Sequence, residues 1–289
     1  MLNIKGEKVK YFTTGGNIML KLRELTNDWE ILVRLNAFFI SYFGWLLFGL
    51  SYGFLGRYSV DVTHYLLQLP FTSRDFVIGL IEFTKSLPLL YWLFEGVYYL
   101  GFSGSIALAV AYLLLYKRDL EASDELFIRY LLSYTVAGSI YLIVHVHAPH
   151  LVYNLPGYIS ESTYLTRQEF VLPSLHNTFA MVNIITLWRY RKEKIGATLI
   201  VLNSLIPFTT LFLGHHWIYD IITGMVLAVI VSRLTAGYSP RLPAMLCGLE
   251  LSYLRRLAVL SFFIGVIVLF LAADPQYWSQ LISNLLGTP

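Results

Sequence analysis

Long apolar runs separated by short polar breaks dominate the chain. Crossing the hydrocarbon of a bilayer as a helix takes about 20 mainly apolar residues, and seven runs approach or exceed that length. The runs cover residues 31–56, 101–116, 126–146, 172–188, 196–213, 217–231 and 257–272. This pattern predicts an all-α fold, a polytopic membrane helix bundle with seven crossings.

The stretch 76–100 is also apolar, but it contains Glu82, Lys85, Pro88 and Glu95. It either crosses the bilayer, which gives nine crossings in total, or lies in the interface. Its many tyrosine and tryptophan residues favour the interface, because these rings gather at the headgroup level. The charged residues then face water or headgroups, although they could instead line a cavity.

Basic residues gather beside alternate runs, within residues 5–34, 117–118, 189–194 and 233–256. Such residues tend to stay cytoplasmic, so the connection 147–171 and the turn around His215 are expected on the other side, together with the carboxyl terminus. We expect three parts. They are a cytoplasmic amphipathic leader (1–30), a membrane-embedded catalytic domain (31–235, motifs within 100–235), and a cytoplasmic connection with a last transmembrane helix (236–289).

The composition supports a membrane protein and excludes other classes. Of 289 residues, 56% are hydrophobic and 13% charged, whereas soluble domains carry about 25% charged residues; the mean hydropathy is +0.61. The single cysteine, Cys247, excludes a disulfide framework and a multi-cysteine metal site. A net charge of +3 from 21 basic and 18 acidic residues does not indicate nucleic acid as a partner.

Six of the seven histidines lie between residues 145 and 216, at helix ends on the same expected side. In Pro173-Ser174-Leu175-His176, proline is expected as the first helical residue. The amides of Ser174 and Leu175 and the Ser174 hydroxyl then form a cradle for an anion such as phosphate, with His176 within reach. The alternative is a plain helix start with a histidine at the headgroup level.

A second cluster spans Gly214 to Asp220, with His216 and Asp220 four residues apart. This spacing places both side chains on one helix face, where the carboxylate can fix the imidazole tautomer and leave a nitrogen as nucleophile or base. The alternatives are a structural pair, or a metal pair with His176. The sequence favours no metal, because a third spaced ligand is missing and His215 points to a different face.

Together the two clusters resemble the type 2 phosphatidic acid phosphatase superfamily. Its Pro-Ser-x-His motif matches 173–176, and its His-x-x-x-Asp motif matches 216–220, forty residues later from histidine to histidine. The doubled histidine, and weakly Ala148-Pro149, look most similar to the inositol phosphorylceramide synthase branch. The resemblance covers roughly residues 100 to 235. It implies a six-helix core, with the helix at 257–272 as an addition.

The resemblance implies a phosphohistidine mechanism without metal or other cofactor. His216 would attack phosphorus with Asp220 bracing its imidazolium, while His176 would protonate the departing oxygen and then deprotonate the incoming water or alcohol. Ser174 and nearby amides, including that of Leu175, would hold the non-bridging oxygens. The chemistry needs positioning and charge stabilisation above all.

The chain departs from the phosphatase members of that superfamily, which place a Ser-Arg pair where Thr209 and Thr210 stand. An upstream Lys and Arg-Pro motif is also missing. Arg167, His150 and His215 could substitute in part, although Arg167 is equally well explained as a headgroup-facing arginine. Because a phosphomonoester carries about two negative charges and a diester one, fewer cations favour a diester.

The sequence therefore predicts a lipid phosphotransferase with its site on the non-cytoplasmic face, acting on a phospholipid or polyprenyl-type lipid. One alternative is a phosphatase of lipid phosphates or isoprenyl diphosphates with the same mechanism. Another is a non-enzymatic transporter whose histidines relay protons or bind an ion. A degenerate scaffold is a third, against which the intact His176, His216 and Asp220 argue.

Overall fold

The computed structural model describes residues 27–156, 158, 169–236 and 251–273. Apart from two short strands, its regular elements are helices, which confirms the all-α prediction. In chain order the elements are α2 (Trp29–Leu55), η1 (Gly56–Tyr58), β1 (Val60–Asp61), α3 (Thr63–Leu66), α4 (Arg74–Ser86), α5 (Pro88–Gly96), η2 (Val97–Gly101), α6 (Phe102–Val110), η3 (Ala111–Lys117), α7 (Leu120–Ile143), β2 (Val144–His145), α8 (Pro149–Val152), α9 (Leu175–Leu187), η4 (Trp188–Tyr190), α10 (Lys194–Phe212), α11 (Ile218–Leu234) and α13 (Leu251–Ala273).

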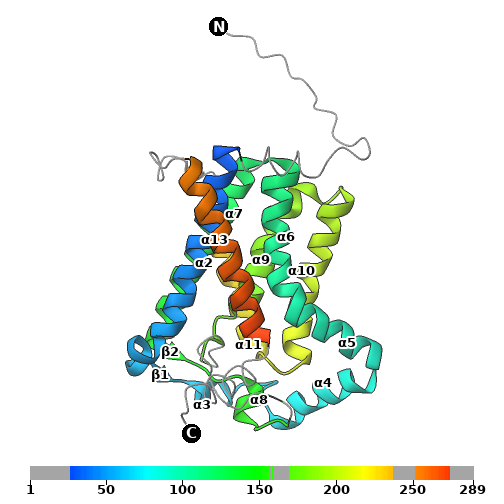
Figure 1. The fold of residues 1–289 in the computed structure, drawn as a ribbon. Helices are drawn as coiled ribbons and strands as arrows, with labels where there is room; N and C mark the ends of the chain where they lie inside the picture. Colours follow the sequence, from blue (N-terminus) through cyan, green and yellow to red (C-terminus); the bar gives the residue numbers. More distant parts are fainter. Residues whose placement is uncertain (1–26, 157, 159–168, 237–250, 274–289) are drawn as a thin grey trace, which may run out of the picture.

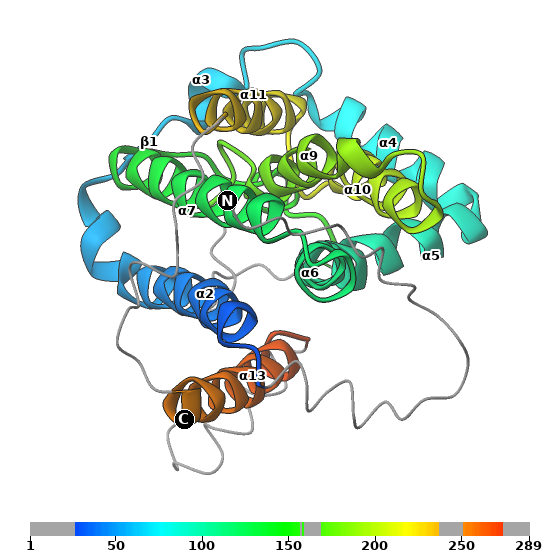
Figure 2. The same ribbon diagram turned by 90° about the horizontal axis from the view of Figure 1, so that it is seen from above.

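Helix α9 is the centre of the bundle and packs against α6, α7, α10 and α11 (Figure 2). Because α9 is surrounded, it has buried polar side chains that pair with those of its neighbours. Asn183 Nδ2 of α9 donates a hydrogen bond to Asn203 Oδ1 of α10 at 2.9 Å. Helix α2 lies between α7 and α13, so α13 stands outside the main group of helices (Figure 2). Helix α9 is therefore held in place by four neighbouring helices.

Four helices among the described residues are long and apolar enough to span a membrane, and they include Pro88–Lys117 as one unbroken 30-residue unit. The predicted span at 101–116 is therefore wrong at its start. Pro88 is the first helical residue, a position where its missing amide does no harm, and α5, η2, α6 and η3 continue from it. The ambiguous stretch 76–100 divides there, and α4 forms a separate helix across one end of the bundle (Figure 1).

The two ends of the bundle differ in charge. At one end, Arg34 holds Asp124 through two buried hydrogen bonds of 2.7 and 2.8 Å, and Lys117 pairs with Glu193 at 2.8 Å. The other end carries α3, α4, α8, β1 and β2 (Figure 1). The described residues of the basic clusters, among them Arg34, Lys117 and Arg189, thus lie at the end opposite the histidines. Which end faces the cytoplasm stays a prediction, as do the boundaries of the three parts. Residues 1–26 of the predicted leader (1–30) lie outside the described residues.

The strands β1 and β2 form a small parallel pair, a feature that the hydrophobic pattern did not indicate. Val60 pairs with Val144 and Asp61 with His145, and a parallel bridge joins Val146 to Phe170. Three segments far apart in sequence are thereby held side by side at the end of the bundle that carries the histidines.

Candidate active site

The first half of the site is the amino terminus of α9. Ser174 is the N-cap, and its Oγ accepts a hydrogen bond from the amide of Asn177 at 3.4 Å. Pro173 therefore precedes the cap and is not the first helical residue, contrary to the sequence prediction. The Ser174 amide is also paired, with the carbonyl of Asp220 at 3.1 Å. Among the described residues, the free amides of the cradle are those of Leu175 and His176, one position later than predicted.

The second half is the turn between α10 and α11. Gly214 has a φ of +71°, which glycine adopts without strain, and the amides of His215 and His216 both donate to the carbonyl of Thr210 at 3.0 Å. Trp217 is the N-cap of α11. His216 therefore precedes the helix, and the prediction that His216 and Asp220 share a helix face is wrong.

The side chain of Asp220 still lies next to His216, because it folds back to cap the start of α11. Its Oδ2 accepts a hydrogen bond from the Trp217 amide at 2.8 Å, and the same oxygen lies 3.5 Å from His216 Nδ1. That distance exceeds a normal hydrogen bond. Asp220 is fully buried, and the electrostatic interactions of a buried carboxylate are stronger than those of a carboxylate in water.

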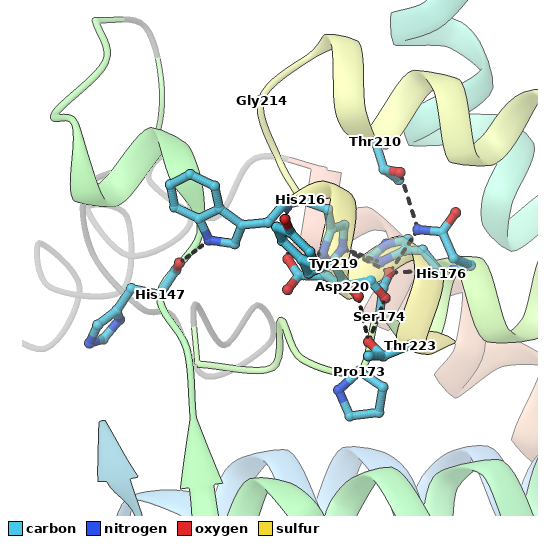
Figure 3. A network of polar contacts seen from close by, with 12 residues as sticks. His147, Pro173, Ser174, His176, Thr210, Gly214, His216, Tyr219, Asp220 and Thr223 are labelled. Atoms are coloured by element: carbon cyan, nitrogen blue, oxygen red, sulfur yellow. Dashed lines mark hydrogen bonds and ion pairs between the residues drawn. The ribbon is translucent and has the colours of Figure 1, made fainter. Parts of the chain in front are cut away.

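The two halves bring the histidines together (Figure 3). His216 Nε2 lies 3.3 Å from His176 Nδ1 and 3.2 Å from Ser174 Oγ. The predicted set of Ser174, His176, His216 and Asp220 therefore surrounds one point at the amino terminus of α9. A phosphate there would be within reach of both imidazoles and of the free amides.

Hydrogen bonds assign the tautomer of His216. Ser174 Oγ accepts from Asn177 Nδ2 at 2.9 Å as well as from the Asn177 amide, so its own hydrogen is left to donate to His216 Nε2. Nε2 then carries the lone pair, and the hydrogen lies on Nδ1, toward Asp220. Burial lowers the pKa of His216 to about 3, which keeps the ring neutral.

Aromatic rings form one wall of the site. Tyr98 of η2 stacks on His215, with ring centroids 4.0 Å apart and planes at 3°, and Phe102 contacts His176 at 4.2 Å between centroids. His150 supports the opposite side through a contact of 3.2 Å between its Nδ1 and the carbonyl of Gly214. His215 and His150 thus hold the turn in place, and burial lowers the pKa of His215 well below its usual value.

No lysine or arginine side chain of the described residues makes a hydrogen bond, ion pair or ring contact with the four converging residues. Arg167, the predicted cation, lies outside the described residues. Thr210 takes part, through a 3.2 Å hydrogen bond from Asn177 Nδ2 to its Oγ1. In the described part of the chain, the site is therefore built from imidazoles, hydroxyls, amides and the carboxylate of Asp220.

Sequence reasoning missed Tyr98, Phe102 and Asn177. Tyr98 falls in the stretch that the sequence favours for the membrane interface and Phe102 in the predicted span 101–116, although their i, i+4 spacing places both on one helix face. Asn177 follows the Pro-Ser-x-His motif directly, and its Oδ1 is buried without a hydrogen-bond partner among the described residues. A buried polar residue immediately after a motif was the available signal.

Comparison with known proteins gives a family match that covers the site. Residues 125–243 match the sequence model of the PAP2 superfamily, a range that contains both motifs. The chain is 34% identical to the uncharacterized protein MJ0662 of Methanocaldococcus jannaschii over 215 residues, which are 71% of this chain and 84% of that protein. No solved structure matches the chain. The chain therefore carries a PAP2 superfamily domain over residues 125–243.

Proposed function

We propose that the protein is an integral membrane lipid phosphotransferase that moves a phosphate-linked headgroup between lipid alcohols through a phosphohistidine. Membership of the PAP2 superfamily supports a phosphatase or phosphotransferase acting on lipids. The observation that carries the finer proposal is the 3.3 Å approach of His216 Nε2 to His176 Nδ1 beside the free amides of α9.

In the first step, the Nε2 lone pair of His216 attacks phosphorus. A nitrogen–phosphorus bond forms while the bond from phosphorus to the leaving alcohol oxygen breaks. His176, which takes up a proton as the anionic phosphate binds beside it, gives that proton to the leaving oxygen. Asp220 stabilises the positive charge that develops on the His216 ring, as a buried carboxylate does for an imidazolium. Ser174 and the amides of Leu175 and His176 hold the non-bridging oxygens.

In the second step, His176 accepts the proton of the incoming alcohol, whose oxygen attacks phosphorus and displaces His216. The enzyme returns to its starting protonation state with no redox change. If water enters instead of an alcohol, the same sequence of steps is hydrolysis.

An apolar groove beside the site supports a lipid as the substrate. It has a volume of about 340 Å³ and lies along the helix that carries Tyr98 and Phe102. Val97 and Gly101 line the groove, while their neighbours Tyr98 and Phe102 contact the site histidines. An acyl or polyprenyl chain in this groove would place its headgroup next to His176.

The charge of the site supports a diester over a monoester. A phosphate near neutral pH carries about two negative charges as a monoester and one as a diester. The described part of the site supplies hydrogen-bond donors and no fixed cation, which suits the single charge. This charge favours transferase activity, as in the inositol phosphorylceramide synthase branch that the motifs resemble. It disfavours phosphatase activity on lipid phosphates or isoprenyl diphosphates.

The test is to incubate the purified protein with a phosphatidylinositol-type lipid, with and without a lipid alcohol acceptor. We expect headgroup transfer that requires the acceptor, and loss of transfer by at least about 10³-fold in His216→Ala. The matched control is His64→Ala, on an exposed histidine of α3. Release of inorganic phosphate alone, and only from monoesters or diphosphates, would show the phosphatase instead.

Trapping experiments separate catalysis from transport. With a lipid labelled at phosphorus, we expect an acid-labile phosphohistidine at His216 that accumulates in His176→Ala, because the second step lacks its base. A transporter would show altered ion or proton flux in His216→Ala and no covalent adduct. Absence of turnover across lipid classes in a folded protein would contradict the enzyme.

A further inference from the structure

A second cluster of metal-ligating side chains lies outside the phosphoryl-transfer site. Asp61, His145 and His147 each place one ligand atom within 4.8 Å of the other two. In an extended segment alternate residues face the same side, and the fully buried Val146 faces away from the two histidines. The β1–β2 register then brings Asp61 opposite His145.

Hydrogen bonds set the tautomer of His145. Ser59 Oγ donates to the carbonyl of Tyr141 at 2.8 Å and lies 3.0 Å from His145 Nδ1. Because the hydroxyl hydrogen is used, Ser59 accepts from His145, which puts the ring hydrogen on Nδ1 and the lone pair on Nε2. This is how outer residues orient histidine ligands in metal proteins.

Thr63 orients the other two donors. Its amide donates to Asp61 Oδ1 at 2.8 Å, and its hydroxyl donates to the same oxygen, which leaves Oδ2 turned toward His147. The Thr63 hydroxyl in turn accepts the His147 amide at 2.9 Å. Asp61 Oδ2 and His147 Nε2 are 3.6 Å apart, near the roughly 3.4 Å between neighbouring ligands of tetrahedral zinc with bonds of 2.0–2.1 Å.

Neither ring nitrogen of His147 makes a hydrogen bond to the described residues, and Nδ1 is buried without a partner. The carboxylate of Glu169 lies close enough to interact electrostatically with His145, brought there by the Val146–Phe170 bridge. Two imidazoles with one or two carboxylates form a donor set typical of zinc.

We propose that Asp61, His145 and His147 bind a divalent transition metal, zinc by preference, as a structural site of the end of the bundle that carries the histidines. The ion would tie β1 to β2. The Trp217 Nε1 hydrogen donates to the carbonyl of His147 at 2.8 Å (Figure 3), and Trp217 directly follows His216. The metal thus stabilises the segment that positions the nucleophile without taking part in phosphoryl transfer.

The test uses full-length protein purified without a polyhistidine tag, stripped with EDTA and titrated with ZnCl₂ while bound zinc and thermal unfolding are measured. We expect about one tightly bound ion per chain and a higher Tm with zinc. Ser59→Ala, which keeps every ligand, should lose about 10–100-fold in affinity, and Asp61→Ala and His147→Ala, which each remove a ligand, should lose more than Ser59→Ala.

Two controls separate this site from the catalytic one. His64→Ala and His216→Ala should bind zinc like the wild type, although His216→Ala is expected to lose turnover. The proposal is overturned if the stripped wild type binds no zinc, a result that depends on no variant. It is also overturned if His147→Ala retains the wild-type affinity, or if His216→Ala loses as much affinity as His147→Ala.

Discussion

At the scale of single residues, two imidazoles of the same chemistry acquire different roles from their neighbours. His216 receives a hydrogen bond from Ser174 and faces a buried carboxylate, which suits a nucleophile. His176 lies at the start of α9 beside Phe102, on the same anion-binding point, without a carboxylate partner among the described residues. These contacts support the proposed division into nucleophile and acid–base group.

The lowered pKa of His216 predicts the acid side of the pH profile. An ordinary histidine has a pKa of about 6.5, whereas burial lowers that of His216 to about 3. His216 therefore stays neutral on mild acidification, so kcat/KM, which reports the free enzyme, should not fall as the pH drops through 6.5. Measured on a phosphodiester lipid, the acid limb should lie nearer pH 3. A fall centred at about 6.5 would contradict this assignment.

Replacement of Asp220 separates its charge from its capping role. Asp220→Asn keeps an acceptor for the Trp217 amide but removes the negative charge, so kcat should fall by about 10²–10⁴-fold with little change in Tm. Asp220→Ala removes the cap as well and should lose a further 0.5–2 kcal/mol or so of stability. Steady-state kinetics and thermal unfolding check both variants. An Asn variant with wild-type kcat would exclude the electrostatic role.

At the scale of secondary-structure elements, the site depends on how closely α9 and α11 approach. Gly224 is the contact point: a Cβ there would lie 2.4 Å from the carbonyl oxygen of Ser174 and 3.2 Å from Thr178 Oγ1. Thr178 Oγ1 lies at 2.8 Å from that Ser174 carbonyl and at 3.1 Å from the Gly224 carbonyl. The absence of a side chain at Gly224 thus lets α11 approach α9 closely enough to contact Ser174, the N-cap residue of α9.

Gly224→Ala should therefore displace Ser174 and reduce activity by about 10²-fold, because small displacements of positioning groups slow catalysis strongly. The matched control is Gly44→Ala on α2, where a Cβ meets nothing within 4 Å, and wild-type activity is expected. Both variants are compared by kcat and by Tm. Equal kcat for both would mean that this helix contact does not position the site.

At the scale of the whole molecule, the described clusters of basic residues and the site histidines lie at opposite ends of the bundle. The basic residues pair with carboxylates at one end, and the histidines cluster at the other (Figure 1). Because basic helix ends tend to stay cytoplasmic, we predict that the site faces the non-cytoplasmic side.

Cysteine labelling in intact cells checks this orientation. In a Cys247→Ser background, Gln68→Cys at the histidine end should react with a membrane-impermeant maleimide, and Lys192→Cys at the basic end should react only after the cells are opened. Both positions are exposed. The reverse pattern would place the site in the cytoplasm.

The bundle could be predicted from the sequence, because apolar run length is a local signal. The convergence of the four residues was implied by the resemblance to the type 2 phosphatidic acid phosphatase superfamily, since the two motifs stand forty residues apart. The starts of the helices were harder to predict. At the start of α9, the amide of the cap residue Ser174 donates a hydrogen bond to the carbonyl of Asp220, which lies forty-six residues away in sequence. The β1–β2 pair could not be predicted, since two-residue strands have no periodicity. Asp61, His145 and His147 meet only through that pairing.

The groove beside Tyr98 opens along the side of a helix that is long enough to span the bilayer. A substrate that enters there arrives by lateral diffusion, so its effective concentration is a surface density. For the proposed reaction, the rate should follow the mole fraction of substrate lipid in a vesicle or detergent micelle. Diluting that lipid with inert amphiphile at constant bulk amount should slow turnover.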